Sequence, residues 1–163
     1  MGNSGVVAFA FGTPYTILAN RRIAQIASQK ARELDAPVYT QRDVLIQPGI
    51  EVQYAGEQPG KPPPTLRIAR ASVAWARQRS LRVLWIVAAK PHLWRVLRDV
   101  RRAVLELGVE IIIHACDEIE QYTEDSWFCR NSTQERVRSL KIWRRREKIL
   151  ELLPFSIYKL IAK

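Results

Sequence analysis

Residues 81–114, LRVLWIVAAKPHLWRVLRDVRRAVLELGVEIIIH, decide the fold. The segment Leu81–Ala89 is apolar on both faces and contains β-branched residues, which predicts a buried, central strand of a parallel sheet. Pro91 suits the first position of the helix that follows, and Gly108 suits its C-cap. A second buried strand is expected at Val109–His114. The stretch thus predicts strand, helix and strand, the βαβ unit of parallel sheets.

The predicted helix between these strands is amphipathic. Its apolar positions recur at helical spacing and predict the face that covers the sheet. The remaining positions predict a polar outer face. The apolar residues are Leu93, Val96, Leu97, Val100, Val104 and Leu107, and the polar ones are Arg95, Arg98, Asp99, Arg102 and Glu106.

The same alternation of strands and helices runs through the N-terminal half. The predicted strands are Val6–Phe11, Pro37–Thr40 and Ile50–Tyr54, and the predicted helices are Thr16–Leu34 and the segment from an N-cap at Thr65 to Arg79. The stretch 56–64 (GEQPGKPPP) is expected to be a loop, because its prolines lack amide donors. These elements predict one domain, residues 1–163, with a three-layer α/β/α Rossmann-like fold around an open, mainly parallel sheet.

The C-terminal segment, residues 131–163, differs from this pattern. Asn131–Glu151 is a basic helical segment that carries Trp143, and Pro154 separates it from a short apolar end, Phe155–Ala162. We expect a basic helical tail that packs on the α/β domain or extends from it.

The composition is that of a folded chain rather than a disordered or membrane-spanning one. Of the 163 residues, 47% are hydrophobic and 26% are charged, enough for the core of one domain. The longest uninterrupted apolar run, Val83–Ala89, is far shorter than the ~20 residues that cross a bilayer. No basic residue precedes the apolar N-terminal stretch, so we expect no secretory signal and a cytoplasmic protein.

The net charge of +10 is concentrated in two segments. Residues 61–110 carry +8 and residues 131–163 carry +6, while residues 1–60 sum to zero and residues 111–130 to −4. Such an excess of positive charge attracts phosphate, nucleic acid or acidic lipid. The alternative is a basic protein whose charge serves no particular ligand.

The main candidate site follows the Leu81–Ala89 strand. Ligands of open parallel sheets bind at the carboxyl ends of the strands, where helix N-termini direct amide donors outward. Lys90 lies in the loop there, and His92 and Arg95 share a face of the next helix. They suit a phosphate or carboxylate, with His92 as a neutral donor, because a helix N-terminus disfavours imidazolium. The alternative is an exposed histidine beside a solvated arginine. Asp117, at another strand end, is placed to meet a ligand hydroxyl.

Other catalytic patterns are absent from the sequence. It contains no GxGxxG, P-loop, GxSxG or HExxH motif, and it shows no pairing of a nucleophile with a base. Residues 114–118 (HACDE) include potential metal ligands without a partner motif, so no metal is expected. Cys116 and Cys129 are expected to be two reduced thiols.

Three segments together resemble a known family. The runs Thr65–Arg70 (TLRIAR), Leu81–Val87 (LRVLWIV) and His92–Arg95 (HLWR) are similar to the YdcF/SanA/ElyC-type family of bacterial α/β domains. In that family a threonine-initiated helix precedes a strand, and the strand ends in a loop with a His-x-x-Arg motif. Glu106–Ile111 and Trp143–Glu147 extend the resemblance over most of residues 5–160. It implies a nucleotide-like ligand and roles connected with the cell envelope.

The chain also departs from the family pattern. The family's glycine-rich loop after the first strand is reduced to Gly12-Thr13-Pro14, and its Ser-Gly-type loop after the second strand is replaced by Thr40–Asp43. The Glu and Asn that follow the family's threonine are replaced by Arg67 and Ile68. Glycines let the backbone approach a phosphate closely, so a loop with fewer glycines leaves less room for one. The resemblance therefore predicts ligand contacts only in the half of the family's pocket that surrounds His92 and Arg95. The complete expected ligand-binding set is Gly12, Thr13, Thr65, Lys90, His92, Arg95 and Asp117.

Three functions fit these observations. The first is the binding of a small anionic or nucleotide-like ligand, such as S-adenosylmethionine, at the carboxyl edge of the sheet. The second is the binding of nucleic acid or an acidic surface through the basic C-terminal half, with Trp75, Trp94 and Trp143 as stacking platforms. The third is a hydrolase or transferase acting on a phosphorylated substrate. For the nucleic-acid-binding function, the expected contact residues are Arg138, Lys141, Arg144, Arg145 and Arg146.

Overall fold

A computed structural model of the chain describes residues 3–57 and 63–162. Its centre is a five-stranded sheet in which every pairing is parallel, in the order β3-β2-β1-β4-β5. The strands are β1 (Ser4–Ala8), β2 (Val38–Thr40), β3 (Val52–Tyr54), β4 (Val83–Val87) and β5 (Ile112–Ala115). Residues 58–62 of the predicted loop 56–64 lie outside the described residues.

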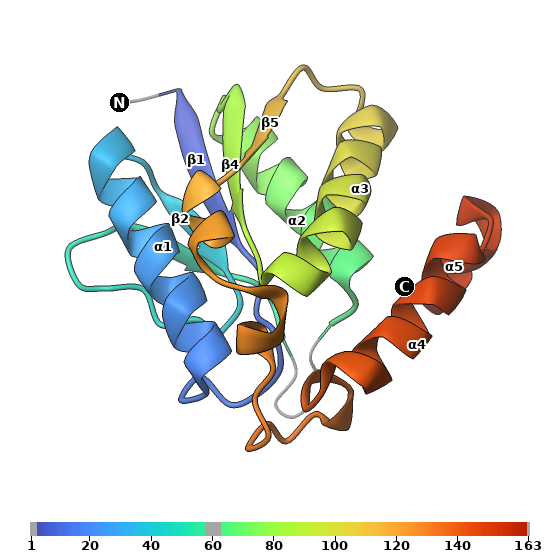
Figure 1. The fold of residues 1–163 in the computed structure, drawn as a ribbon. Coiled ribbons are helices and arrows are strands. Elements are labelled where there is room, and N and C mark those ends of the chain that lie inside the picture. Colours follow the sequence, from blue (N-terminus) through green and yellow to red (C-terminus); the bar gives the residue numbers. More distant parts are fainter. Residues whose placement is uncertain (1–2, 58–62, 163) are drawn as a thin grey trace.

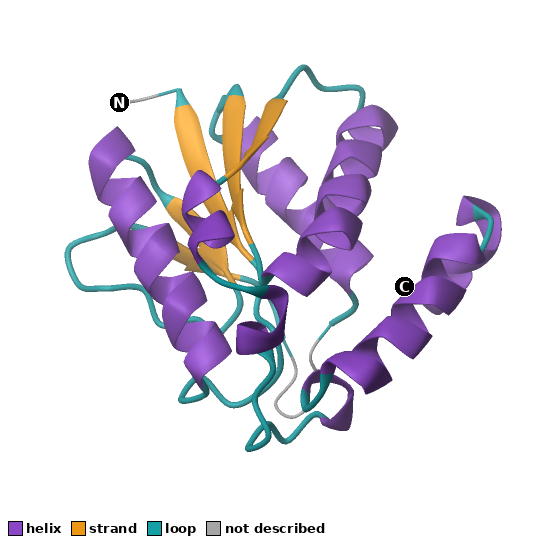
Figure 2. Ribbon diagram, in the orientation of Figure 1, coloured by secondary structure: helices purple, strands orange, loops and turns teal. Residues whose placement is uncertain are grey.

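Helices cover both faces of this sheet (Figure 1). Helix α1 (Leu18–Leu34) packs on one face, and α2 (Thr65–Gln78) and α3 (Lys90–Leu107) pack on the other. The residues of β1 alternate between the two cores: Val6 packs with residues of α1, and Val7 packs with residues of α2 and α3. The predicted three-layer α/β/α Rossmann-like fold is confirmed, and Figure 2 shows the strands enclosed between helices.

Several boundaries differ from those expected. The strand predicted at 81–89 is β4, Val83–Val87, and it lies between β1 and β5, so the central strand is β1 instead. Pro91 is the second residue of α3 rather than the first. Gly108 is the C-cap, with a left-handed φ of 59°. The predicted N-cap at Thr65 is wrong: Pro64 holds that position, and Thr65 is the first residue of α2.

The residues after β5 form short turns and then a helical arm. Two 3-10 turns, η1 (Asp117–Gln121) and η2 (Glu124–Trp127), follow β5 and bury Ile119 and Trp127. Residues 131–162, called the arm below, contain η3 (Glu135–Val137), α4 (Leu140–Leu152) and α5 (Phe155–Ile161). Figure 1 shows α4 and α5 on the side of α3 away from the sheet, and the rings of Phe155 and Tyr158 in α5 contact Arg102 and Arg98 of α3. No helix among the described residues is long and apolar enough to cross a membrane.

The arm packs on the face of α3 that the sequence predicts to be solvated. Arg95 and Asp99, expected on that polar face, are both buried. The Tyr158 hydroxyl donates a 2.5 Å hydrogen bond to Oδ2 of Asp99. The indole Nε1 of Trp143 donates a 3.0 Å bond to the carbonyl oxygen of Pro91. Arg95 and Asp99 therefore contact protein rather than water, while Arg102 and Glu106 of the same face remain exposed.

The loop after β1 is fixed from within the core. Asn20, fully buried on α1, accepts a hydrogen bond from the backbone N–H of Phe11 and donates to the carbonyl oxygens of Gly12 and Pro14. Gly12 has a φ of 95°, and a Cβ there would lie 2.5 Å from Cγ2 of Val137. The loop can therefore meet the arm only with glycine at position 12.

Replacing Gly12 by alanine is expected to destabilise the protein by about 3 kcal/mol, because left-handed strain and overpacking against Val137 add together. Gly49 is a matched control, since its φ is 85° but nothing lies within 4 Å of a Cβ there. Gly49→Ala is expected to cost about 1 kcal/mol from strain alone. Urea unfolding of both variants measures the difference, and equal losses would contradict the close approach of the arm.

Candidate functional site

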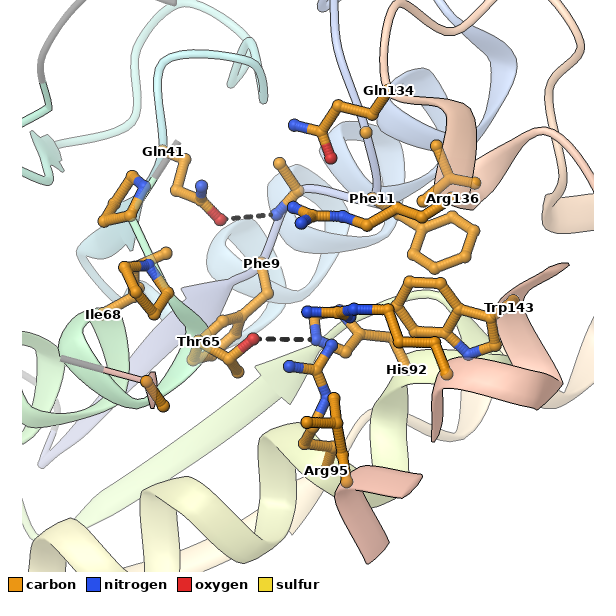
Figure 3. Close-up of a pocket in the computed structure, with 18 of the residues that line it drawn as sticks. Phe9, Phe11, Gln41, Thr65, Ile68, His92, Arg95, Gln134, Arg136 and Trp143 are labelled. Atoms are coloured by element: carbon orange, nitrogen blue, oxygen red, sulfur yellow. Dashed lines mark hydrogen bonds between the residues drawn. The ribbon is translucent and has the colours of Figure 1, made fainter. Parts of the chain in front are cut away.

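A cavity of about 240 Å³ lies at the carboxyl ends of the strands. The connections run in opposite directions from β1 and β4. The cavity is lined by the loop Phe9–Gly12, which follows β1, and by His92 and Arg95 of α3, the helix that follows β4. Such a point is where ligands of open α/β sheets bind. The first turn of α2 and the arm complete the wall, as Figure 3 shows.

Three guanidinium groups face this cavity. Arg95 comes from α3, Arg136 from η3 and Arg146 from α4. One carboxylate accompanies them: Oε2 of Glu147 lies 3.1 Å from Nε of Arg95, and its Oε1 lies 3.6 Å from Arg146. Within residues 3–57 and 63–162, no carboxylate forms an ion pair with Arg136. The cavity wall therefore carries a surplus of positive charge.

The pKa values of these groups reflect that surplus. Burial, together with the smaller effects of the guanidinium groups of Arg146 and Arg95, lowers the pKa of Arg136 to about 10. Burial also lowers the pKa of Arg146, again with help from Arg95. All three arginines remain charged at neutral pH. Their mutual repulsion is a cost that a bound anion would relieve.

His92 is buried in the same wall and is neutral. Burial lowers its pKa well below the usual value, and the charges of Arg95, Arg136 and Arg146 add to the effect. Its Nε2 lies 3.1 Å from the hydroxyl of Thr65, a contact that is drawn in Figure 3. The rings of Phe11 and Trp143 lie 6.1 Å and 5.5 Å from the imidazole, centroid to centroid. The imidazole is thus held in place between aromatic neighbours.

Two long helices begin at the cavity without neutralising their own dipoles. Neither α2 nor α3 has an acidic residue in its first turn, and neither has a side-chain cap. Thr65 and His92, in the first turns of these helices, line the cavity, so the positive ends of both helix dipoles lie at the same site as the arginines. Backbone and side chains thus give the site the same sign of charge.

The structure brings together four of the seven residues expected to bind a ligand. Gly12, Thr65, His92 and Arg95 line the cavity. The other three lie elsewhere among the described residues. Thr13 holds the arm, because its carbonyl oxygen accepts bonds from Ser132 and Thr133. Lys90 pairs with Glu120 at 2.6 Å, and Asp117 is exposed in η1.

Of the five cations expected at a nucleic-acid interface, Lys141, Arg144 and Arg145 share an exposed face of α4, and Arg138 and Arg146 lie elsewhere. Arg146 lines the cavity, while Nε of Arg138 donates to the carbonyl oxygen of Ser132. Arg144 pairs with Glu124 at 2.9 Å. Lys141 and Arg145 are exposed on α4. Of the three expected stacking residues, Trp75 and Trp143 are buried and Trp94 is 52% exposed.

Sequence reasoning did not assign Arg136, Gln41 or Tyr158 to the cavity. Gln41 follows β2 and accepts a hydrogen bond from the backbone N–H of Ala10 through its Oε1. Arg136 and Tyr158 lie in short elements whose position no periodic pattern reveals. A signal existed for Gln41, since it follows a predicted strand at the edge where ligands bind. Arg146 was identified, but for another role.

The two cysteines are separate from this site. Cys116 and Cys129 are both free and buried in the core on the α1 face of the sheet. Burial raises the pKa of Cys116 to about 12, so its thiol stays protonated.

Replacing Glu147 by glutamine is expected to lower the free energy of unfolding by about 3 kcal/mol, because it leaves the buried Arg95 beside two other cations. Glu151→Gln, one turn later on the exposed side of α4, is the control and is expected to change stability by less than about 0.5 kcal/mol. Urea unfolding compares the two variants. Equal stabilities would show that the ion pair does not hold the arm.

Comparison with known proteins adds no assignment to this geometry. No family model, no curated protein and no solved structure matches the chain. The function of the cavity is therefore inferred from its own residues, its place at the carboxyl edge of the sheet and its charge.

Proposed function

We propose that the protein binds a small phosphate-bearing or nucleotide-like anion in this cavity. The observation that carries the proposal is the convergence of Arg95, Arg136 and Arg146 on one cavity. Among the described residues, Glu147 is the only carboxylate that forms an ion pair with any of these three arginines. Guanidinium groups recognise phosphate oxygens through paired hydrogen bonds. The N-termini of α2 and α3 favour the same ligand.

The cavity supports a compact ligand rather than a large cofactor. Its volume of about 240 Å³ is below that of sites for drug-sized molecules, which begin near about 300 Å³. S-adenosylmethionine fits less well, because its sulfonium carries positive charge toward three guanidinium groups. A phosphate ester with a small organic part satisfies both the size and the charge.

The proposal includes kinship with the YdcF/SanA/ElyC-type family. Thr65, His92 and Arg95, which carry much of that resemblance, are among the residues that meet at the cavity. The narrowed loop at Gly12 is consistent with the departure from the family's glycine-rich pattern, because it closes against Val137 of the arm.

Calorimetric titration with inorganic phosphate, AMP and ADP is expected to show binding, and S-adenosylmethionine is expected to bind more weakly. Arg136→Ala and Arg146→Ala should each weaken binding about tenfold or more, since each removes a charged hydrogen-bond donor. Arg145→Ala removes the same charge outside the cavity and should leave affinity unchanged. Absence of binding by the wild type, or an equal effect of all three variants, would refute the site.

A second candidate function is nucleic-acid binding by the exposed face of α4. Lys141, Arg144, Arg145 and Lys148 lie at helical spacing on that face and are exposed. On this reading, the double variant with Lys141→Ala and Arg145→Ala weakens the binding of a single-stranded oligonucleotide, while Arg136→Ala does not. Affinity would also fall steeply with salt, and a flat salt response would exclude this function.

A further inference from the structure

The cavity wall contains a hydroxyl and an imidazole in direct contact. Thr65 Oγ1 lies 3.1 Å from Nε2 of His92, and the two residues are 7% and 6% exposed. They lie 27 residues apart in sequence, in the first turns of α2 and α3, so the sequence does not reveal the pair. We propose that Thr65 is a nucleophile and His92 its general base, acting on a small phosphate monoester held by the cavity's arginines. The inference rests on the proposed anion site.

His92 meets the requirements of a general base. Its ring is unprotonated at neutral pH, because burial and three nearby arginines disfavour the imidazolium form. The negative charge of a phosphate monoester bound beside the ring opposes that effect and favours the transfer of a proton to Nε2. For Nε2 to accept, the ring carries its proton on Nδ1, which has no hydrogen-bond partner among the described residues. Phe11 and Trp143 fix the plane of the ring, which keeps Nε2 directed at the Thr65 hydroxyl (Figure 3).

Thr65 meets the requirements of a nucleophile. As the first residue of a 14-residue helix, it lies where the helix dipole favours negative charge on an attacking oxygen. The first turn of α2 contains no acidic side chain that would oppose that charge. A hydroxyl nucleophile is weak by itself and needs an adjacent base, and His92 is within hydrogen-bond distance.

The three arginines of the cavity differ in how closely a carboxylate pairs with them. Arg95 is held by Glu147, which fixes its position beside His92. Arg136 has no ion-pair partner in the described part of the chain, and Arg146 has a longer contact of 3.6 Å with Glu147. Arg136 and Arg146 are therefore the groups free to bind phosphoryl oxygens and to stabilise the charge that spreads over them in the transition state.

The reaction balances with water as the co-reactant. Thr65 Oγ1 attacks phosphorus as its proton passes to His92 Nε2, so an O–P bond to Thr65 forms and the ester O–P bond breaks. The alcohol leaves on the opposite side as an oxyanion and takes a proton from solvent. Water then attacks the phosphothreonine in line, the O–P bond to Thr65 breaks, and His92 returns its proton to Thr65. The water gives up a proton to solvent, and the net products are the alcohol and inorganic phosphate.

The experiment measures turnover of p-nitrophenyl phosphate alongside calorimetric binding of inorganic phosphate. We expect Thr65→Val and His92→Gln to lower kcat about 100-fold or more, the usual contribution of a general base. Thr65→Ser should retain turnover, since it keeps the hydroxyl. His114→Gln changes the other histidine of the sequence, which lies exposed on β5, and should turn over normally. Thr65→Val should still bind phosphate, which shows that the cavity remains folded.

The other outcomes show whether the anion site, the catalytic pair or both are wrong. Binding of phosphate by the wild type without turnover would overturn the catalytic pair and leave the anion site in place. Turnover that survives in Thr65→Val would overturn the role of Thr65. A phosphorylated enzyme that is labile in acid would place the phosphoryl group on histidine instead, because phosphothreonine is stable in acid. Loss of both binding and turnover in the wild type would remove the anion site and the catalytic pair together.

Discussion

The ion pair between Arg95 and Glu147 connects the two parts of the molecule on which the cavity depends. Arg95 belongs to α3, which packs on the sheet, and Glu147 belongs to the arm, and both side chains are less than a tenth exposed. A buried pair gains little by itself, since desolvation offsets the attraction, but loss of one partner leaves a costly unpaired charge. The pair therefore fixes where the arm lies more than it stabilises the fold.

The position of the arm turns an open edge of the sheet into an enclosed site. Without the arm, the carboxyl ends of β1 and β4 would present two helix N-termini and the His92–Arg95 turn to solvent, where charges are screened. The arm contributes Arg136 and Arg146 and covers part of this edge, and lower exposure to water strengthens the electrostatic interactions of the buried groups. The same enclosure makes His92 neutral. The concentration of positive charge opposes stability, as is common at functional sites.

The sequence predicted the fold well and half of the site. Buried strands alternating with amphipathic helices follow directly from hydrophobic periodicity, and a turn after a parallel strand marks the ligand edge, so His92 and Arg95 were identified. Periodicity says nothing about which polar face a later segment covers. Asp99 was therefore expected in solvent, although Tyr158 buries it. Arg136 was missed for the same reason, because its position depends on how the arm docks.

The composition of the cavity wall has a consequence for the order in which the chain is made. Translation proceeds from the N-terminus, and all five strands are complete once Ala115 has emerged from the ribosome. Arg136, Arg146 and Glu147 follow Ala115 in the sequence and emerge from the ribosome after it. The nascent chain can thus pair its five strands before it has any place for an anion, and a cellular metabolite cannot assist that early step of folding. A bound ligand can therefore stabilise the protein only after the arm has docked on the sheet and its helices.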